Sequence, residues 1–160
     1  MDKIIQIRKV SLEFLQLVFE MKIIMNRLNG SEKIVMMSEA VREAESYFTE
    51  NRSVFVYNIK NKMIGYSVLK TEDQVVWLDW LFIDKDHHGK GIASKLFDHA
   101  EEFAMKLGND QLYIWVHPDN HHMLKFLKKK GYDVLNLIEV KKEKCDIKEI
   151  IQILGNEFRY

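Results

Sequence analysis

A loop rich in glycine and lysine carries the clearest chemical signal in the sequence. It runs from Asp84 to Lys95, between an apolar stretch and a long helical pattern. Gly89 and Gly91 flank Lys90 where the helix is expected to begin, so no side chain shields the free N–H groups of its first turn. These groups and the positive end of the helix dipole attract anions. The loop therefore predicts a seat for a phosphate or a pyrophosphate, with lysines around it.

The spacing excludes the two familiar nucleotide loops. A Walker loop needs four residues between its first glycine and a Gly-Lys-Ser/Thr triplet, and no segment of the chain has that spacing. A dinucleotide loop needs a third glycine where this chain has Ser94, and an acidic residue after the next strand where it has His117. A strand-to-helix turn without any ligand remains the simpler alternative.

The strand that leads into this loop contains a carboxylate. Residues 74–83 are almost continuously apolar, which is typical of a strand buried on both faces, and Asp79 interrupts them. A carboxylate in a buried strand is costly unless it is paired or used in chemistry. Asp79 is therefore a candidate catalytic residue, and an ion pair with a neighbouring donor is the alternative interpretation.

The elements that would position this loop and strand follow from apolar periodicity and capping residues. We expect strands at residues 4–10, 54–59, 63–69, 111–116 and 132–140, besides 74–83. Helices are expected at residues 11–30, 38–50, 91–107 and 120–131. This order predicts an α/β fold with a central mixed six- to seven-stranded sheet flanked by about four helices. The first half of the sheet is expected to be antiparallel, and the second half to contain a parallel βαβ crossover. The tail, 145–160, fits one more short strand or helix.

Composition limits the class of protein. With 160 residues, 47% of them hydrophobic, residues 1–160 are expected to form a single domain. The one cysteine, Cys145, excludes an intrachain disulfide. The longest apolar stretch, 14–25, is interrupted by polar residues, and the N-terminus lacks the apolar core of a signal peptide. We therefore expect a soluble, cytoplasmic protein with no membrane partner.

Neither a nucleic-acid partner nor a metal is expected. The 24 basic and 24 acidic residues cancel, whereas nucleic-acid binders usually carry a basic excess. A basic face is conceivable, but such runs are usually solvated; its lysines are Lys128, Lys129, Lys130, Lys141, Lys142 and Lys144. The histidine pairs 87–88 and 121–122 could approach a metal, but adjacent histidines in a loop rarely point the same way.

Two motifs together make residues 54–140 resemble the GNAT superfamily of N-acetyltransferases, which bind acetyl-CoA. The superfamily's phosphate motif is Gln/Arg-x-x-Gly-x-Gly/Ala, and here His88, Gly91 and Ala93 stand at its three marked positions. Gly65 and Asp79 also match a frequent glycine of the third strand and a frequent acidic residue of the fourth. The second motif, Asn-x-x-Ala-x-x-Phe-Tyr-x-x-x-Gly-Phe, is followed in spacing by Asn120, Met123, Phe126, Leu127, Gly131 and Tyr132.

The resemblance implies a binding site for acetyl-CoA as co-substrate. Its pyrophosphate would be held by the backbone N–H groups of His88, Gly89, Lys90, Gly91, Ile92, Ala93 and Ser94. The pantetheine arm would pair with the backbone of Leu81, Phe82 and Ile83, where a bulge splays the fourth and fifth strands. Asn120 would hydrogen-bond the arm, and Asp79 would act as general base.

The resemblance also has departures that bear on mechanism and substrate. The tyrosine that often protonates the departing thiolate is replaced by Leu127, and the glutamate of many enzymes that act on protein N-termini is replaced by Trp115. The resemblance implies direct acetyl transfer in a ternary complex to a primary amine, on a small molecule or a peptide, by a chain that could form homodimers. A non-catalytic CoA-binding or regulatory module is the alternative. Trp77, Trp80 and Trp115 could line the acceptor pocket or belong to the core.

Overall fold

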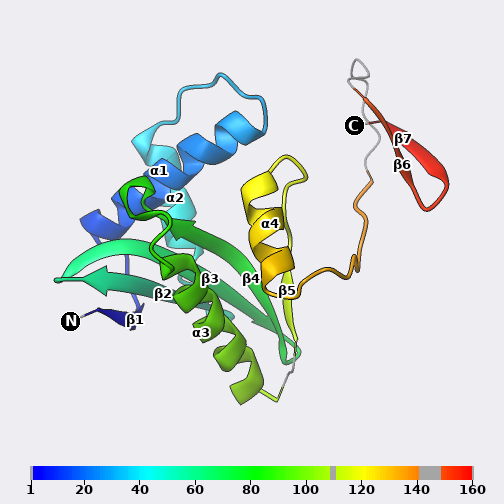
Figure 1. Cartoon of the computed structure of the whole chain (residues 1–160). Coiled ribbons are helices and arrows are strands. Elements are labelled where there is room, and N and C mark those ends of the chain that lie inside the picture. The colour runs from blue at the N-terminus through cyan, green and yellow to red at the C-terminus, as the bar shows by residue number, and fades with distance from the viewer. Residues whose placement is uncertain (1, 109–110, 141–148, 160) are drawn as a thin grey trace. The chain divides into compact units, whose positions relative to one another are not determined.

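The computed structural model describes residues 2–108, 111–140 and 149–159. Contacts between residues divide the chain into two compact units, Met1–Leu124 and Lys125–Tyr160. The first unit holds a sheet with helices, and the second holds a short hairpin (Figure 1). Each unit is described by itself, and the single domain expected over residues 1–160 stays a prediction.

The first unit is built on a mixed five-stranded sheet. Its strands lie in the order β1-β2-β3-β4-β5, with three antiparallel junctions and a parallel one between β4 and β5. Two tight turns, at Lys60-Asn61 and Asp73-Gln74, have positive φ at both residues, as hairpins with the right-handed twist require. The predicted mixed α/β sheet is confirmed. The strands are β1 (Lys3–Ile7), β2 (Arg52–Ile59), β3 (Lys62–Glu72), β4 (Val75–Ile83) and β5 (Leu112–Ile114).

The described residues form four α-helices, as the sequence predicts, and one 3-10 turn. The Ser11 side chain caps α1 by accepting a hydrogen bond of 3.2 Å from the N–H of Phe14. Nowhere in the described ranges is a helix both long and apolar enough to span a membrane. The helices are α1 (Leu12–Leu28), α2 (Met37–Ser46), α3 (Ile92–Lys106) and α4 (His121–Lys129), and the 3-10 turn is η1 (Lys85–His87).

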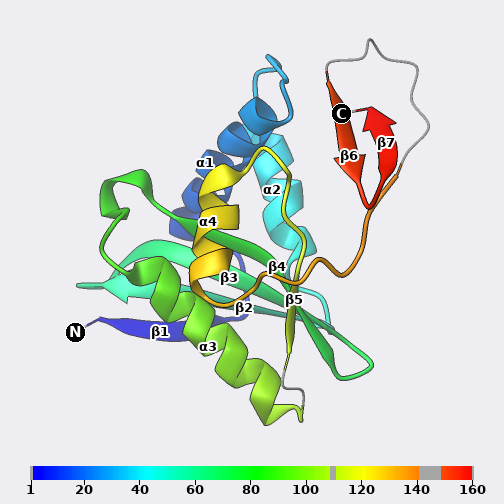
Figure 2. The same ribbon diagram turned by 45° about the vertical axis from the view of Figure 1, so that its right-hand side comes forward.

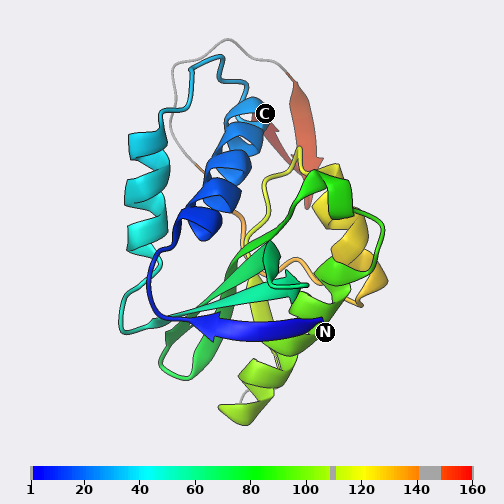
Figure 3. The same cartoon turned by 90° about the vertical axis from the view of Figure 1, so that its left-hand side faces the viewer.

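Helices cover both faces of the sheet (Figures 1 and 3). Along β2, Val54 and Val56 pack against the buried residues of α1 and α2. The alternate residues Phe55 and Tyr57 point to the other face of the sheet, where the ring of Phe55 contacts that of His99 on α3. Burial of apolar side chains from three layers therefore holds β2, β3 and β4 between the helices.

The second unit contains a correction to the sequence analysis. Residues 132–140, predicted as a strand, form none; Val134 and Leu135 are exposed there. Strand formers adopt a strand only where a neighbour supplies hydrogen bonds, and the described residues give this segment no such neighbour. β6 (Ile150–Ile153) and β7 (Asn156–Arg159) instead pair as a separate hairpin (Figure 2). The central sheet thus has five strands rather than six or seven, and Cys145 lies outside the described residues.

The packing of α3 buries part of a histidine. The ring of His99 lies 4.5 Å from that of Phe55, centroid to centroid, and its buried Nδ1 has no hydrogen-bond partner among the described residues. Burial lowers the pKa of His99, Lys106 lowers it slightly further, and Glu102 opposes the change. Because the folded state resists protonation, falling pH favours the unfolded state once the unfolded histidine begins to bind a proton.

We therefore predict that His99→Leu weakens the acid sensitivity of the fold. The free energy of unfolding of the wild type should decline as pH falls below about 6.5, the pKa of an unfolded histidine, and the decline should be smaller in the variant. Urea unfolding at pH 7.5 and 5.5 measures both. Exposed His122→Leu is the control, and equal declines in all three proteins would contradict the prediction.

Candidate functional site

Strand β4 changes register in its middle. Leu78 lies opposite Leu69 and Trp80 lies opposite Val68, so Asp79 is an extra residue without a partner on β3. Such a bulge bends a strand and raises its local twist. The resemblance implies a bulge at Leu81, Phe82 and Ile83; in the structure it lies earlier in the strand, at Asp79.

Beyond the bulge, one edge of β4 is open. β5 pairs only with Val76, Trp77 and Leu78 of β4, so no strand among the described residues lies beside Leu81, Phe82 and Ile83 on that edge. The other edge is close to β3, since a Cβ built on Gly65 would lie 2.6 Å from the Phe82 carbonyl oxygen. Successive residues of a strand direct their backbone groups to opposite edges. The backbone groups of Leu81 and Ile83 therefore face the open edge.

The glycine loop follows directly and presents a second set of unpaired groups. Gly89 and Gly91 have φ of +74° and +75°, a conformation that side chains rarely adopt, and Gly91 is the N-cap of α3. Within the described ranges, nothing accepts a hydrogen bond from the backbone N–H groups of residues 89–94. A Cβ built on either glycine meets no atom within 4 Å. These amides and the helix dipole can bind an anion.

A turn on Asp84 shapes the start of the loop. One carboxylate oxygen accepts a 3.1 Å hydrogen bond from the N–H of Asp86, and the other lies 3.3 Å from Nδ1 of His87. Burial alone would raise the pKa of Asp84, but the Asp86 N–H and His87 outweigh it and hold the pKa below its usual value. The turn therefore stays ordered with an ionised carboxylate.

Of the lysines expected around the seat, Lys95 lies elsewhere. Its Nζ donates to the hydroxyl of Tyr57 at 2.8 Å and stands 5.3 Å from the centre of that ring, and this contact raises the pKa of Lys95. The hydroxyl of Tyr57 donates in turn to Asp2 at 3.4 Å. Lys90 stays with the loop, where its Nζ donates to the Asp86 carbonyl at 2.9 Å. The candidate anion site is therefore defined by the backbone amides of the loop more than by its lysine side chains.

Asp79 has the partner that the alternative interpretation foresaw. Nε of Arg52 donates to its Oδ2 at 3.0 Å, and Nη1 of Arg52 donates to the Ser46 carbonyl at the end of α2. The Oδ1 atom of Asp79 accepts no hydrogen bond from the described residues. Sequence analysis missed Arg52 because this contact crosses from β2 over β3 to β4, and no local pattern signals it.

The three tryptophans divide between core and surface. Trp80 packs against Tyr47, with 6.3 Å between ring centroids, beside the core of α1 and α2. Trp77 on β4 contacts Tyr113 and Trp115, at 5.0 and 5.3 Å between centroids, and Trp115 is 74% exposed. An aromatic surface therefore lies beside the parallel junction of β4 and β5.

The second motif lies on α4. The Oδ1 atom of Asn120 accepts a 3.1 Å hydrogen bond from the N–H of Met123 and so caps the helix. Its Nδ2 group donates to no acceptor in the part of the chain that the structure describes. Leu127, at the position of the usual tyrosine, lies in the last half of the helix and has no group that could donate a proton.

The histidines and acidic residues of the described ranges form no set of three that could hold a metal ion. His87 is engaged by Asp84, and Nε2 of His88 lies 2.8 Å from the Ile83 carbonyl oxygen. The lysines at 141, 142 and 144, part of the basic face considered above, lie outside the described residues.

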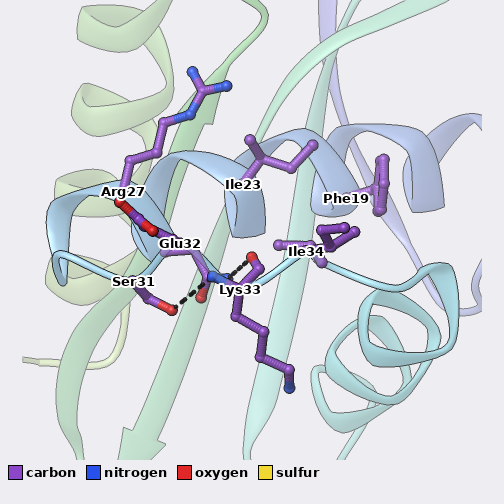
Figure 4. Close-up of a pocket in the computed structure, with 9 residues that line it drawn as sticks. Phe19, Ile23, Arg27, Ser31, Glu32, Lys33 and Ile34 are labelled. Atoms are coloured by element: carbon purple, nitrogen blue, oxygen red, sulfur yellow. Dashed lines mark hydrogen bonds between the residues drawn. The ribbon is translucent and has the colours of Figure 1, made fainter.

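A cavity of about 490 Å³ lies elsewhere, between the second half of α1 and the loop that follows (Figure 4). Phe19, Ile23 and Ile34 form its apolar wall, and Asn26 and Glu32 add polar groups. It shares no residue with β4 or the glycine loop.

Comparisons with known proteins agree on a family. Residues 22–132 match the family model described as acetyltransferase (GNAT) family. An uncharacterized N-acetyltransferase of Methanocaldococcus jannaschii is 25% identical over 92 residues, 53% of this chain and 41% of the relative. A probable spermine N(1)-acetyltransferase of Bacillus subtilis subsp. natto is 28% identical over 76 residues, 47% of this chain and 50% of the relative. The chain spans about half the length of these relatives, or less.

Solved structures share the fold. The aminoglycoside N-acetyltransferase AAC(6')-Iy in complex with CoA has a TM-score of 0.64 at 14% identity, covering 91% of this chain and 96% of that chain. An integron cassette protein from the mobile metagenome of V. cholerae has a TM-score of 0.70 at 17% identity, covering 91% and 93%. At these identities the likeness shows the fold alone.

The close approach of β3 to β4 yields a prediction for Gly65→Ala. The new methyl group would meet the Phe82 carbonyl oxygen at 2.6 Å, so one strand must shift, at a cost of about 1–3 kcal/mol in the free energy of unfolding. Urea unfolding measures this loss. Gly30→Ala is the control, since its Cβ meets nothing within 4 Å and only its positive φ is strained. A loss in Gly65→Ala no larger than in Gly30→Ala would contradict the prediction.

Proposed function

The chain belongs to the GNAT acetyltransferase family, and we propose that it transfers an acetyl group from acetyl-CoA to a primary amine. One observation carries the proposal: two sets of unpaired backbone groups follow each other along the chain. The open edge of β4 at Leu81 and Ile83 is the first, and the amides of residues 89–94 are the second. A ligand with an extended amide-bearing arm and a diphosphate would satisfy both.

The residues present fit CoA on chemical grounds. Backbone N–H groups from His88 to Ser94 would hold the pyrophosphate, and the backbone of Leu81 and Ile83 would pair with the pantetheine arm. Phe82, expected from the sequence to take part in this pairing, instead directs its carbonyl to β3. The space beside Gly89 and Gly91 supports this, because no Cβ blocks approach to the amides. Nδ2 of Asn120 would donate to the arm. The CoA complex of AAC(6')-Iy, a protein of the same fold, is consistent with this assignment.

Asp79 is the proposed general base. Acetyl-CoA supplies an activated carbonyl, which a neutral amine can attack. An amine with a pKa of about 10.4 is mostly protonated at pH 7, and its deprotonation costs about 4.6 kcal/mol. The ion pair with Arg52 fixes Oδ2 of Asp79, and Oδ1 would accept the proton, directly or through water.

The proposal needs no side-chain acid at Leu127. A thiol has a pKa near 8.5, so its thiolate leaves readily without protonation. The unpaired N–H groups on the open edge of β4 would stabilise the developing oxyanion.

We propose a small-molecule amine as acceptor. The names of two related proteins mention spermine and aminoglycosides, both of which carry several amines. The aromatic surface of half-buried Trp77 and exposed Trp115 supports a cationic acceptor, because aromatic faces attract ammonium groups. The cytoplasmic location and the homodimer stay predictions.

We predict that the protein binds CoA and releases free thiol from acetyl-CoA when a suitable amine is added. Calorimetry measures the binding, and a thiol reagent measures turnover across a panel with spermine and aminoglycosides. Binding of CoA without turnover on any amine would favour the non-catalytic module. Absence of CoA binding would contradict the proposal.

Two glycine variants localise the diphosphate seat. Gly91→Ala and Gly108→Ala stand at the two ends of α3, both with positive φ and with open space around the new Cβ. Both should lose similar stability from backbone strain. Only Gly91→Ala should weaken CoA binding, because its methyl group would project beside the loop amides.

A pair of variants separates catalysis by Asp79 from its ion pair. Asp79→Asn should lower kcat by about a hundredfold or more, the usual contribution of a general base. Arg52→Gln breaks the same contact but keeps the carboxylate, so its kcat should fall much less. Equal losses in the two variants would contradict the base role and leave Asp79 as a structural residue.

A further inference from the structure

The last peptide unit of β4 has a fixed orientation. The N–H of Asp84 donates to the Ile64 carbonyl on β3 at 2.8 Å. In a trans peptide the N–H and the C=O point in opposite directions, so the Ile83 carbonyl of the same unit points away from β3. It therefore lies on the open edge of β4, where β5 provides no partner.

The side chain of His88 meets this carbonyl. Its Nε2 lies 2.8 Å from the oxygen, a short distance for a neutral N–H···O bond. A carbonyl oxygen can only accept, so Nε2 carries a proton and donates it to the Ile83 carbonyl. Five residues after the strand ends, the chain is thus bonded back to the strand's edge.

Few other contacts hold this part of the loop. Gly89 and Gly91 lack side chains, have open space around them and adopt positive φ. Lys90 bonds within the loop, to the Asp86 carbonyl, and the next buried residue is Ile92 at the start of α3. Between η1 and α3, His88 is therefore the side chain that joins the loop to the sheet.

We propose that His88 is a positioning residue whose side chain pins the glycine loop to the end of β4. This bond sets the span between the loop amides and the open strand edge, and it occupies the Ile83 carbonyl so that Leu81 and the Ile83 N–H remain for the ligand. The inference rests on the proposed function. The inference gives a positioning role to His88, which stands where the phosphate motif usually has glutamine or arginine.

The distance between the loop amides and the open edge of β4 matters only to a ligand that contacts both. CoA has a diphosphate for the loop and an arm for the strand edge, whereas adenosine 3′-phosphate 5′-diphosphate keeps the diphosphate and lacks the arm. His88→Ala should therefore weaken CoA binding about tenfold, near the upper range for one lost hydrogen bond, and weaken binding of the armless nucleotide less than about threefold. Calorimetry on the full chain measures both constants.

Two variants control for side effects. His88→Gln retains an N–H donor of similar reach and should restore CoA binding to within about threefold of the wild type. His87→Ala removes the neighbouring histidine, which contacts Asp84 and not the strand, and should weaken CoA binding much less than His88→Ala does. Thermal unfolding checks that each variant is folded.

A measurement on the ligand-free wild type tests the bond directly. Nitrogen-15 NMR at neutral pH should find the proton of His88 on Nε2. A ring that carries its proton on Nδ1 and none on Nε2 would overturn the inference, whatever the variants do, and this readout remains if His88→Ala fails to fold.

The binding data separate the two proposals. If the wild type binds CoA but His88→Ala binds it equally well, or loses both ligands equally, the positioning role is wrong and the proposed function stands. Failure of glutamine to restore binding would likewise overturn the role. If the wild type binds neither ligand, the proposed function fails and the inference falls with it.

Discussion

Backbone hydrogen-bonding groups must find partners, and this constraint governs the structure. The first half of the sheet satisfies it through continuous antiparallel pairing from β1 to β4. At the end of β4 the pairing stops on one side, because β5 is short and lies beside the strand only up to Leu78. The first turn of α3 adds amides that no helix can satisfy within itself. The unpaired groups are therefore concentrated at one place, next to each other in the chain.

The rest of the fold stabilises the end of β4 although one of its edges has no partner strand. The cores on the two faces hold β2, β3 and β4 through side chains, so the end of β4 does not need a second neighbour to stay in place. The close approach at Gly65 fixes the paired edge, and the Arg52–Asp79 contact ties the bulge to the end of α2. The strand is thus rigid along one edge and open along the other.

The order of elements, the mixed sheet and the local caps were predictable from the sequence, whereas individual side-chain contacts across the sheet were not. The cap at Ser11 and the glycine at the start of α3 depend on residues within one turn, and the sequence located both. The partner of Asp79 and the contact of Lys95 with Tyr57 join residues 27 and 38 positions apart, which only the folded sheet brings together. The strand predicted at residues 132–140 was wrong for the same reason, since strand propensity does not say whether a neighbouring strand exists. The candidate site was accessible to sequence reasoning because most of it is backbone, marked by two glycines.

In a site built mainly from backbone groups, few side chains have to take part in the chemistry. A helix without a donor at Leu127 is tolerable if the leaving thiolate needs no acid and the oxyanion is held by strand amides. Side chains are then needed chiefly to take the amine's proton and to keep the backbone groups in position. Asp79 at the bulge and His88 after the strand flank the same open edge, one on each side of Leu81 and Ile83. The departure from the superfamily pattern at Leu127 is therefore compatible with catalysis, because the loss falls on a step that the chemistry of the thiolate already makes easy.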